Sequence, residues 1–324
     1  MLKKIEISHK TIIFTAMFLL LLWFLFLIRD IILGLFAALL IMAILNPFVT
    51  RLAKYKIPRS LAIFLTYILV FGVLGFTIAS IITPLVEETA SFANGLPKYL
   101  ENLGVFSFLG EQTAKDILTQ VVSLPGQVFK VGISIFSNLV STLASLVFAF
   151  YLLLARNKIG EQLSTFLGEE KGKDVGRVID KLERKLGAWA RGELILMVSV
   201  GLAIFVGLKI LGIPYALPLA ILAGLLEIVP SLGPIIAAIP SIVIGLGISP
   251  VMGLATTALA FLVHQLENYF LVPKIMEKSV GLSPIAILLS LAIGAKVAGI
   301  VGILISVPVL VTVQVLFKEY SDRK

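Results

Sequence analysis

A polar cluster in the last third of the sequence has residue types and a spacing that could carry protons or bind a cation. Within the segment His264-Gln265-Leu-Glu267-Asn268, three side chains stand at positions i, i+3 and i+4 and share one face of a helix. Imidazole and carboxyl groups bind and release protons, and the amides of Gln265 and Asn268 can hydrogen-bond a hydroxylated solute. The cluster could instead be the polar end of a helix, because a proline and a lysine follow within two turns.

A second carboxyl group, that of Glu227, precedes a segment that cannot continue a regular helix. The residues after it are Ile-Val-Pro230-Ser-Leu-Gly233-Pro234. Each proline removes a backbone donor and interrupts the helical hydrogen bonds. A carboxylate beside carbonyl groups released in this way could bind a cation or exchange a proton, although a structural capping role explains the same residues.

Two lysines stand within otherwise apolar sequence. Lys296 is flanked by Gly294, Ala295 and Gly299, and it could lie at a hairpin tip facing a cavity or anchor an interface. With Lys296, the candidate binding residues are Glu227, Pro230, Gly233, Pro234, His264, Gln265, Glu267, Asn268 and Lys296. Lys209 lies near the end of its apolar run, where a long side chain can reach water, and is interpreted as structural.

Several classes of chemistry are excluded by what the sequence lacks. It has no cysteine, and its second histidine is His9 near the N-terminus, so no zinc site is expected. No glycine-rich loop ending in Lys-Ser/Thr occurs, which argues against an ATP-driven pump within this chain. No recognition motif or basic–aromatic patch indicates nucleic acid. We therefore expect no catalytic residue, no metal, no cofactor and no enzymatic activity.

The composition indicates which elements must position these side chains. Of 324 residues, 59% are apolar and 14% are charged, whereas about a quarter of the residues in soluble domains are charged. A membrane-spanning helix needs roughly 20 apolar residues. Runs of this order cover residues 11–28, 31–50, 60–86, 131–155 and 194–211, and broken apolar runs cover 210–317. The sequence predicts an all-α polytopic membrane protein with about eight hydrophobic helical segments, and Asn46-Pro47 is interpreted as the stop of the second.

Charges in the polar segments predict the orientation in the membrane. Segment 51–59 holds four bases and no acid, and segment 156–193 holds nine bases. Such segments face the cytoplasm in most membrane proteins. The stretch 87–130, with five acids against three bases, is predicted on the other side. These assignments place both termini in the cytoplasm of a multi-pass inner-membrane protein.

The same features divide the chain into three regions. Residues 1–155 form a four-helix membrane region with an extracytoplasmic helical insert at 87–130. Residues 156–193 have apolar side chains at helical spacing, which predicts a cytoplasmic amphipathic helix or, alternatively, a binding site for a soluble partner. Residues 194–324 are predicted to be a transport region with broken helices.

The C-terminal region carries nine of the fourteen prolines. Transporters use broken helices of this kind around their substrates, although simple kinking for packing is the alternative. A weak repeat is present, since Pro218-Leu-Ala-Ile-Leu returns as Pro284-Ile-Ala-Ile-Leu 66 residues later. Segments 214–249 and 281–317 therefore either cross the membrane once each or form re-entrant hairpins, broken near 230–234 and near 296–302. The positive-inside tendency favours the hairpins weakly.

Taken together, these motifs resemble the autoinducer-2 exporter family of bacterial membrane proteins, over essentially the whole chain. The resemblance rests on Asn46-Pro47, Arg191-Gly192-Glu193, Gly212-Ile-Pro214-Tyr-Ala216-Leu, the segment Glu227–Pro234 with Ile239-Pro240, Gln265-Leu-Glu267-Asn268 with Pro273-Lys274-Ile275, Gly281-Leu-Ser-Pro284 and Val307-Pro308. The family's usual Arg-Gly-Gln is Arg-Gly-Glu here, and its usual Gln-Gln is His264-Gln265. These departures leave the substrate and the coupling open.

The resemblance implies an elevator-type, oligomeric carrier in a bacterial cell membrane, with a pentamer as one candidate assembly. Members are described either as exporters of the signalling furanone or as sodium/proton antiporters. Two transport hypotheses follow for this chain: export of a small polar molecule, or exchange of Na+ or another cation for H+. A membrane scaffold without transport activity, docking partners through 87–130 and 156–193, is a third hypothesis of another class.

The hairpin hypothesis predicts that residues 274–278 face the cytoplasm. The chain has no native cysteine, so the variant Ser279→Cys reports on one position alone. This cysteine should resist an impermeant maleimide added to intact cells and react after the cells are opened. Ready labelling from outside would instead favour two simple spans.

Overall fold

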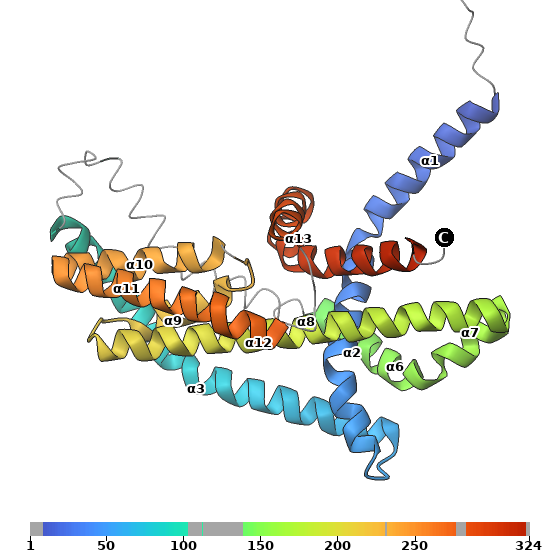
Figure 1. Ribbon diagram of the computed structural model, residues 1–324, viewed down its shortest axis with the longest axis horizontal. Helices are drawn as coiled ribbons and strands as arrows, with labels where there is room; N and C mark the ends of the chain where they lie inside the picture. Colours follow the sequence, from blue (N-terminus) through green and yellow to red (C-terminus); the bar gives the residue numbers. More distant parts are fainter. Residues whose placement is uncertain (1–8, 103–111, 113–138, 231, 277–282, 322–324) are drawn as a thin grey trace, which may run out of the picture.

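The computed structural model describes residues 9–102, 112, 139–230, 232–276 and 283–321, and every regular element within them is helical (Figure 1). The elements are α1 (His9–Leu27), α2 (Arg29–Ala53), α3 (Arg59–Asn102), α6 (Leu139–Ala155), the 3-10 turn η1 (Arg156–Lys158), α7 (Ile159–Leu167), α8 (Glu169–Ile210), α9 (Ala216–Leu226), α10 (Leu232–Ile248), α11 (Pro250–Leu266), the π-helical turn η2 (Glu267–Leu271), α12 (Val272–Met276) and α13 (Pro284–Ser321).

The lengths and compositions of these helices confirm the predicted fold class. Within the described ranges, five helices are long and apolar enough to cross a membrane: Ile31–Ala53, Arg59–Asn102, Thr142–Leu167, Glu169–Ile210 and Val301–Ser321. Three shorter apolar helices accompany them: Ala216–Leu226, Leu232–Ile248 and Ile285–Gly299. The protein is an all-α polytopic membrane protein.

Helix α8 runs through the centre of the molecule. It packs against α9, α11 and α12 along one half and against α2, α7 and α13 along the other (Figure 1). Its 42 residues contain no proline, so the charged segment up to Glu193 and the apolar run that follows form one continuous helix. At 1.5 Å per residue this helix is about 63 Å long. The sequence division at residue 193 therefore falls inside a helix.

The interpretation of Asn46-Pro47 as a helix stop is wrong, because α2 continues through Pro47 to Ala53. Proline has no N–H to donate to the carbonyl group four residues earlier, that of Ala43. Arg191 of α8 supplies this donor, with its Nη1 atom 2.8 Å from the Ala43 oxygen and 3.3 Å from the Ile44 oxygen. A contact with another helix thus allows the proline inside α2.

An ion-pair network beside this crossing joins four helical segments. Glu183 of α8 accepts hydrogen bonds from Asn46 Nδ2 at 2.5 Å and from Arg156. Arg156 also pairs with Asp180. Arg59 donates to Asn46 Oδ1 at 2.9 Å and to the Leu153 carbonyl at 2.7 Å. Two bases that the sequence assigned to polar segments, Arg59 and Arg156, therefore hold α2, α3, α6 and α8 together.

A second packing centre joins the end of α3 to the C-terminal half. Its buried side chains are Phe92, Leu96, Leu100, Leu208, Ile213, Ala216, Leu219 and Ile244. Glu88 of α3 accepts a hydrogen bond from the Leu217 backbone N–H at 3.2 Å, which satisfies a free donor at the start of α9. The first part of the predicted insert 87–130 is therefore a continuation of the third apolar helix, as far as Asn102.

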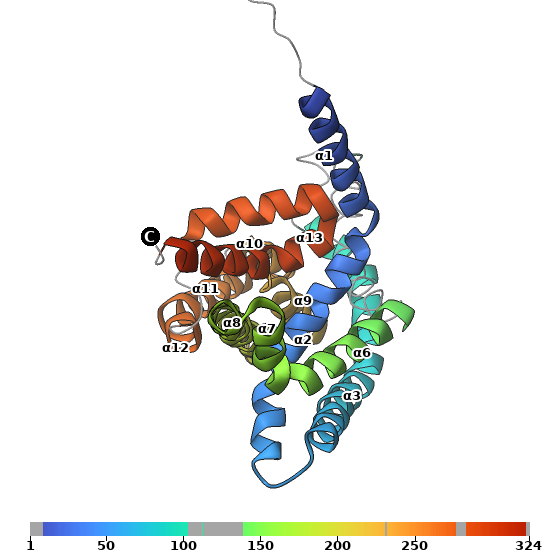
Figure 2. The same ribbon diagram turned by 90° about the vertical axis from the view of Figure 1, so that its right-hand side faces the viewer.

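Both predicted breaks in the C-terminal region are present. Helix α9 ends at Leu226, and α10 begins at Leu232. Helix α13 is bent at Ala298 and Gly299, where the Gly299 φ is +58°. The two arms of α13 meet at the bend (Figure 2), where Gly294 packs against Gly302, and the second arm then runs at an angle to the first (Figure 1). Helices α9 and α10 form one helical hairpin, and the two arms of α13 form the other. That each hairpin enters and leaves the membrane on the same side stays a prediction.

The second arms of the two hairpins each carry a proline at the same distance from the preceding break. Leu232 begins α10 eight residues before Pro240, and Ile300 follows the bend of α13 eight residues before Pro308. Most of the insert beyond Asn102, the first part of the run 131–155, and the maleimide position Ser279 lie outside the described residues.

The contact between the arms of α13 predicts the effect of a small substitution. A Cβ atom at Gly302 would overlap the Gly294 carbonyl group, so Gly302→Ala should force the arms apart. We expect a loss of stability of about 1–3 kcal/mol, typical of overpacking. The measurement is thermal unfolding of the purified protein in detergent.

Gly72→Ala is the matched control, because a Cβ atom at Gly72 has no heavy atom within 4 Å. This change should leave the unfolding temperature unchanged or raise it slightly, since alanine favours a helix. Equal unfolding temperatures for both variants would contradict the tight contact between Gly294 and Gly302.

Candidate functional site

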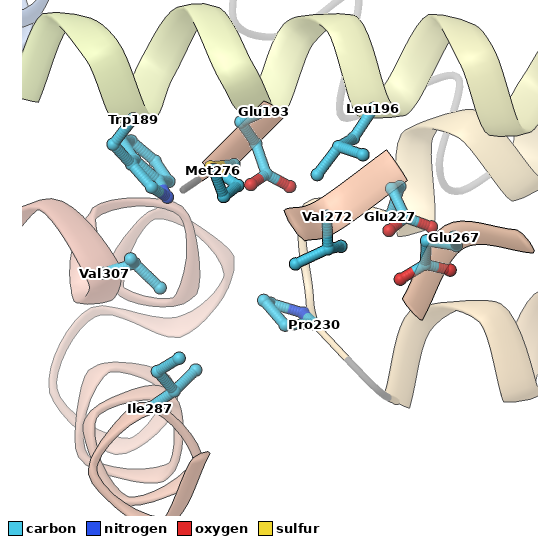
Figure 3. A pocket seen from close by; sticks show the side chains of 10 residues that line it. All are labelled: Trp189, Glu193, Leu196, Glu227, Pro230, Glu267, Val272, Met276, Ile287 and Val307. Carbon is cyan, nitrogen blue, oxygen red and sulfur yellow. The ribbon is translucent and has the colours of Figure 1, made fainter. Parts of the chain in front are cut away.

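A cavity of about 260 Å³ lies where α8, the break after α9, the η2 turn and both arms of α13 meet (Figure 3). Its lining residues are Trp189, Glu193 and Leu196 of α8, Glu227 and Pro230 of the break, Glu267 of η2, Val272 and Met276 of α12, and Ile287 and Val307 of α13. The lining is apolar except for three carboxyl groups and the indole N–H. Of the sequence-predicted residues, the cavity thus brings together Glu227, Pro230 and Glu267.

Three buried carboxyl groups dominate the chemistry of this cavity. Glu193, Glu227 and Glu267 are 6%, 3% and 5% exposed, respectively. The carboxyl groups of Glu227 and Glu267 lie next to each other, and that of Glu193 points into the cavity from α8 (Figure 3). The three are close enough to interact electrostatically.

Among the described residues, no lysine or arginine lines the cavity beside these carboxyl groups, and His264, the histidine beside Glu267, lies outside the lining. Oε2 of both Glu227 and Glu267 lacks a hydrogen-bond donor within the described part of the chain. Buried negative charges without partners are costly. Protons, a cation or hydroxyl donors of a solute are therefore the species that this cavity is suited to bind.

His264 lies beside Glu267 rather than in the main cavity. Its Nδ1 atom is 3.5 Å from Glu267 Oε2, and its Nε2 atom is 3.0 Å from Asn268 Nδ2. An amide N–H can only donate, so Nε2 accepts the hydrogen bond from Asn268, and Nδ1 is the ring nitrogen on the side of Glu267. His264, Glu267 and Pro234 also line a small cavity of about 20 Å³, enough for one water molecule.

The π-helical turn η2 begins at Glu267, and His264 contacts both Glu267 and Asn268, so the shared helix face predicted from their spacing is present. The Val272 N–H bonds to the Glu267 carbonyl, five residues earlier. Such turns frequently occur at functional sites. Glu267 is buried in the cavity, whereas the exposed Asn268 donates to the His264 carbonyl at 3.0 Å and is absent from the cavity lining.

The other candidates have different surroundings. Gly233 is buried against the Leu226 carbonyl, where it allows the chain to turn back between α9 and α10. Gln265 is half-buried and is not among the residues that line the cavity. Lys296 lies near the bend of α13, as the hairpin-tip interpretation has it, but its side chain is exposed and is absent from the lining.

Sequence reasoning missed Glu193 as a site residue. The charged segment 156–193 is predicted to be cytoplasmic, and that prediction places Glu193 outside the buried region. The continuous α8 instead carries Glu193 into the cavity, while its neighbour Arg191 is held by the carbonyl groups of α2. The available signal was an acid directly before an apolar run. Nothing in the sequence distinguishes the apolar lining residues, such as Trp189 and Val307, from the many other apolar residues of the chain.

Comparison with known proteins decides the family. A model of the AI-2E family transporter matches residues 12–322. The chain belongs to the AI-2E transporter family. The resemblance stated from the sequence motifs is thereby confirmed, and the protein is assigned to a family of transporters with several apolar membrane helices.

Several relatives of this AI-2E family member are named transport proteins. "Putative transport protein YueF" of Bacillus subtilis is 28% identical over 295 residues, covering 85% of this chain and 80% of the relative. "Putative transport protein YrrI" of the same organism is 23% identical, covering 90% and 87%. A "putative transport protein" of Haemophilus influenzae is 25% identical, covering 96% and 93%. These names specify transport and no substrate.

Proposed function

We propose that this AI-2E family protein is a secondary transporter that exports a small polar molecule and binds it in the three-carboxyl cavity. The observation that carries the proposal is the burial of Glu193, Glu227 and Glu267 around one cavity at the meeting point of two helical hairpins. Interrupted helices around a substrate are typical of secondary transporters.

The size and lining of the cavity suit a small hydroxylated solute. Its volume of about 260 Å³ is near the lower end of ligand-binding cavities. Carboxylates accept hydrogen bonds from hydroxyl groups, and the face of Trp189 offers an apolar wall to a ring. A furanone like autoinducer-2 is the solute that the family resemblance implies, and an anionic solute is disfavoured by the three acids.

Proton coupling is assigned to Glu227 and Glu267. Two adjacent buried carboxyl groups are more stable when they share a proton than when both are ionised, because like charges repel in a low-dielectric site. The imidazole of His264, whose Nδ1 atom is 3.5 Å from Glu267 Oε2, places a second titratable group beside the shared proton. Release of the proton and binding of the solute can then alternate at the same oxygens.

The remaining parts of the proposal come from the resemblance. They are an elevator-type movement, a homo-oligomer such as a pentamer, and a location in the bacterial inner membrane with both termini in the cytoplasm. The architecture is compatible with such a movement, since α8 forms one wall of the cavity and the two hairpins with α12 form the others. A shift of one wall against the other would open the cavity.

Exchange of a cation for protons is the second candidate function. The observation in its favour is the third acid, Glu193, in a cavity whose lining includes no base. Hard cations such as Na+ prefer carboxylate and carbonyl oxygens, and both are present near the break after α9. Transport assays in proteoliposomes, with labelled solute or with a pH-sensitive dye and sodium, distinguish the two candidates from a scaffold that transports nothing.

Glu267→Gln and Glu227→Gln test the assigned proton carriers. Glutamine keeps the shape and can still hydrogen-bond, but it cannot ionise. An antiporter that protonates these groups should retain almost no activity, and a solute exporter should slow by about tenfold or more, equivalent to about 1.4 kcal/mol of barrier. The measurement is the initial transport rate at matched protein density.

The exposed acid Glu101, at the end of α3, offers the matched control. Glu101→Gln removes the same charge outside the cavity and should transport like the wild type. Wild-type rates in the Glu267 and Glu227 variants as well would mean that these acids are structural caps.

Glu193→Gln separates the two transport hypotheses. The resemblance places glutamine at this position, and an amide can still hydrogen-bond a hydroxyl group. Export of a neutral solute should therefore stay within about threefold of the wild type, or about 0.6 kcal/mol. A cation/proton exchanger that uses all three carboxylates should bind its cation more weakly. An unchanged half-saturating sodium concentration for dye-detected exchange would argue against a cation site that includes Glu193.

A further inference from the structure

Glu267 lines the small cavity of about 20 Å³ as well as the three-carboxyl cavity. Three polar side chains border the small cavity: Ser241 of α10, His264 of α11 and Glu267 of η2. The other residues that line it are valine, isoleucine, alanine and proline. A space of this volume holds one molecule of the size of water. The small cavity is therefore an apolar compartment with three polar groups in its wall.

Two of these polar groups have buried atoms that lack a hydrogen-bond partner. Oε2 of Glu267 and Nδ1 of His264 are both buried, and neither atom has a partner in the part of the chain that the structure describes. The two atoms are 3.5 Å apart, which is beyond the ordinary length of a hydrogen bond. Glu267 is only 5% exposed, and an unpaired polar atom at such burial costs free energy. A polar contact of this length indicates a bridging molecule.

The donors and acceptors in the wall of the small cavity complement one another. The hydroxyl group of Ser241 donates to the Ala238 carbonyl at 2.8 Å, so the lone pairs of its oxygen can accept a hydrogen bond. On the His264 ring, Nε2 accepts from Asn268, so Nδ1 is the nitrogen that can donate. Oε2 of Glu267 is an acceptor. The small cavity thus offers one donor and two acceptors to a bound molecule.

We infer that the small cavity binds one water molecule, which accepts a hydrogen bond from His264 Nδ1 and donates to Glu267 Oε2 and Ser241 Oγ. Three hydrogen bonds are the usual number for a buried water molecule. A single water molecule also supplies the missing partners of both unpaired atoms. A cation fits this wall less well, because hard cations prefer several oxygen ligands and the donating nitrogen of His264 would repel one.

The water molecule makes His264 and Ser241 positioning residues for Glu267, and this role rests on the proposed function. The carboxyl groups of Glu227 and Glu267 form a hydrogen bond with each other. Water on Oε2 holds the Glu267 carboxyl group by one oxygen, so that the other oxygen stays available for the proton shared with Glu227. The same water molecule connects α10 and α11 with η2, and thereby joins the first hairpin to the turn that carries Glu267.

The direct test is an experimental structure of the full chain at a resolution that shows ordered water. We expect one density peak at about 2.7–3.2 Å from Glu267 Oε2, His264 Nδ1 and Ser241 Oγ. A peak with shorter contacts to several oxygen atoms would mean a bound cation, and a cavity without density would mean that the two atoms stay unpaired. Either of these results would overturn the inference. The test is independent of transport activity.

Ser241→Val tests the water molecule by displacing it, because valine lacks the hydroxyl acceptor and adds methyl groups to the wall of the small cavity. The matched control is Ser290→Val in α13, outside both cavities, whose hydroxyl group also donates to the carbonyl three residues earlier at 2.8 Å. Displaced water would leave Glu267 Oε2 and His264 Nδ1 unpaired, so Ser241→Val should unfold about 2–4 °C below the control. If the small cavity is dry, filling it should stabilise the protein, and Ser241→Val should unfold above the control.

Infrared spectroscopy tests the positioning role separately. The C=O stretching band of a protonated carboxyl group moves to higher frequency when its oxygen loses a hydrogen bond. The wild type should show such a band that Glu267→Gln removes; Ser241→Val should raise its frequency, and Ser290→Val should leave it in place. An unshifted band in Ser241→Val would contradict the positioning of Glu267 by water. A wild type without this band would contradict the shared proton of the proposed function, whereas the density peak tests the water molecule by itself.

Discussion

Backbone groups at membrane depth must find hydrogen-bond partners within the protein, and the architecture of this chain depends on that constraint. Prolines and bends release such groups at several places. At Pro47 the orphaned Ala43 carbonyl is bound by Arg191 of α8. At the break after α9, the Val229 N–H bonds to the Leu226 carbonyl at 2.9 Å and the Gly233 N–H to the Val229 carbonyl at 2.8 Å. Each irregular segment is thereby compatible with a place inside the bundle.

The same constraint explains why the carboxyl cavity lies where it does. Breaks in helices create room and polar backbone in a region that is otherwise apolar, and a buried acid is best tolerated beside them. Glu227 caps the end of α9 at one break, and Glu267 begins the π-helical turn after α11. Glu193 comes from the uninterrupted α8 and points into the same cavity (Figure 3). A cavity built from two broken elements and one rigid helix combines a binding site with parts that can move against each other.

The distribution of charge follows from the long central helix. The half of α8 that precedes the apolar run carries bases that serve two purposes. Arg191 satisfies α2 carbonyl groups, whereas Arg184 and Lys185 face the end of α13 across a groove that both helices line. Glu183, on the same half, is held by Asn46 and Arg156. The acidic and basic side chains of α8 therefore have different partners, depending on which neighbouring helix their face of α8 contacts.

The sequence by itself determined the helical class, the number of apolar segments, the breaks near 230–234 and 296–302, and two of the three cavity acids. Apolar runs, prolines and isolated charges can be read from the local sequence. They are informative here because a bilayer requires long apolar helices and penalises unpaired polar groups. Only the tertiary structure decided that Pro47 lies inside a helix, because its missing donor is replaced from α8. Tertiary structure also decided that Glu193 is buried and that Asn268 is not, because burial depends on the neighbouring helices, which residue spacing does not reveal.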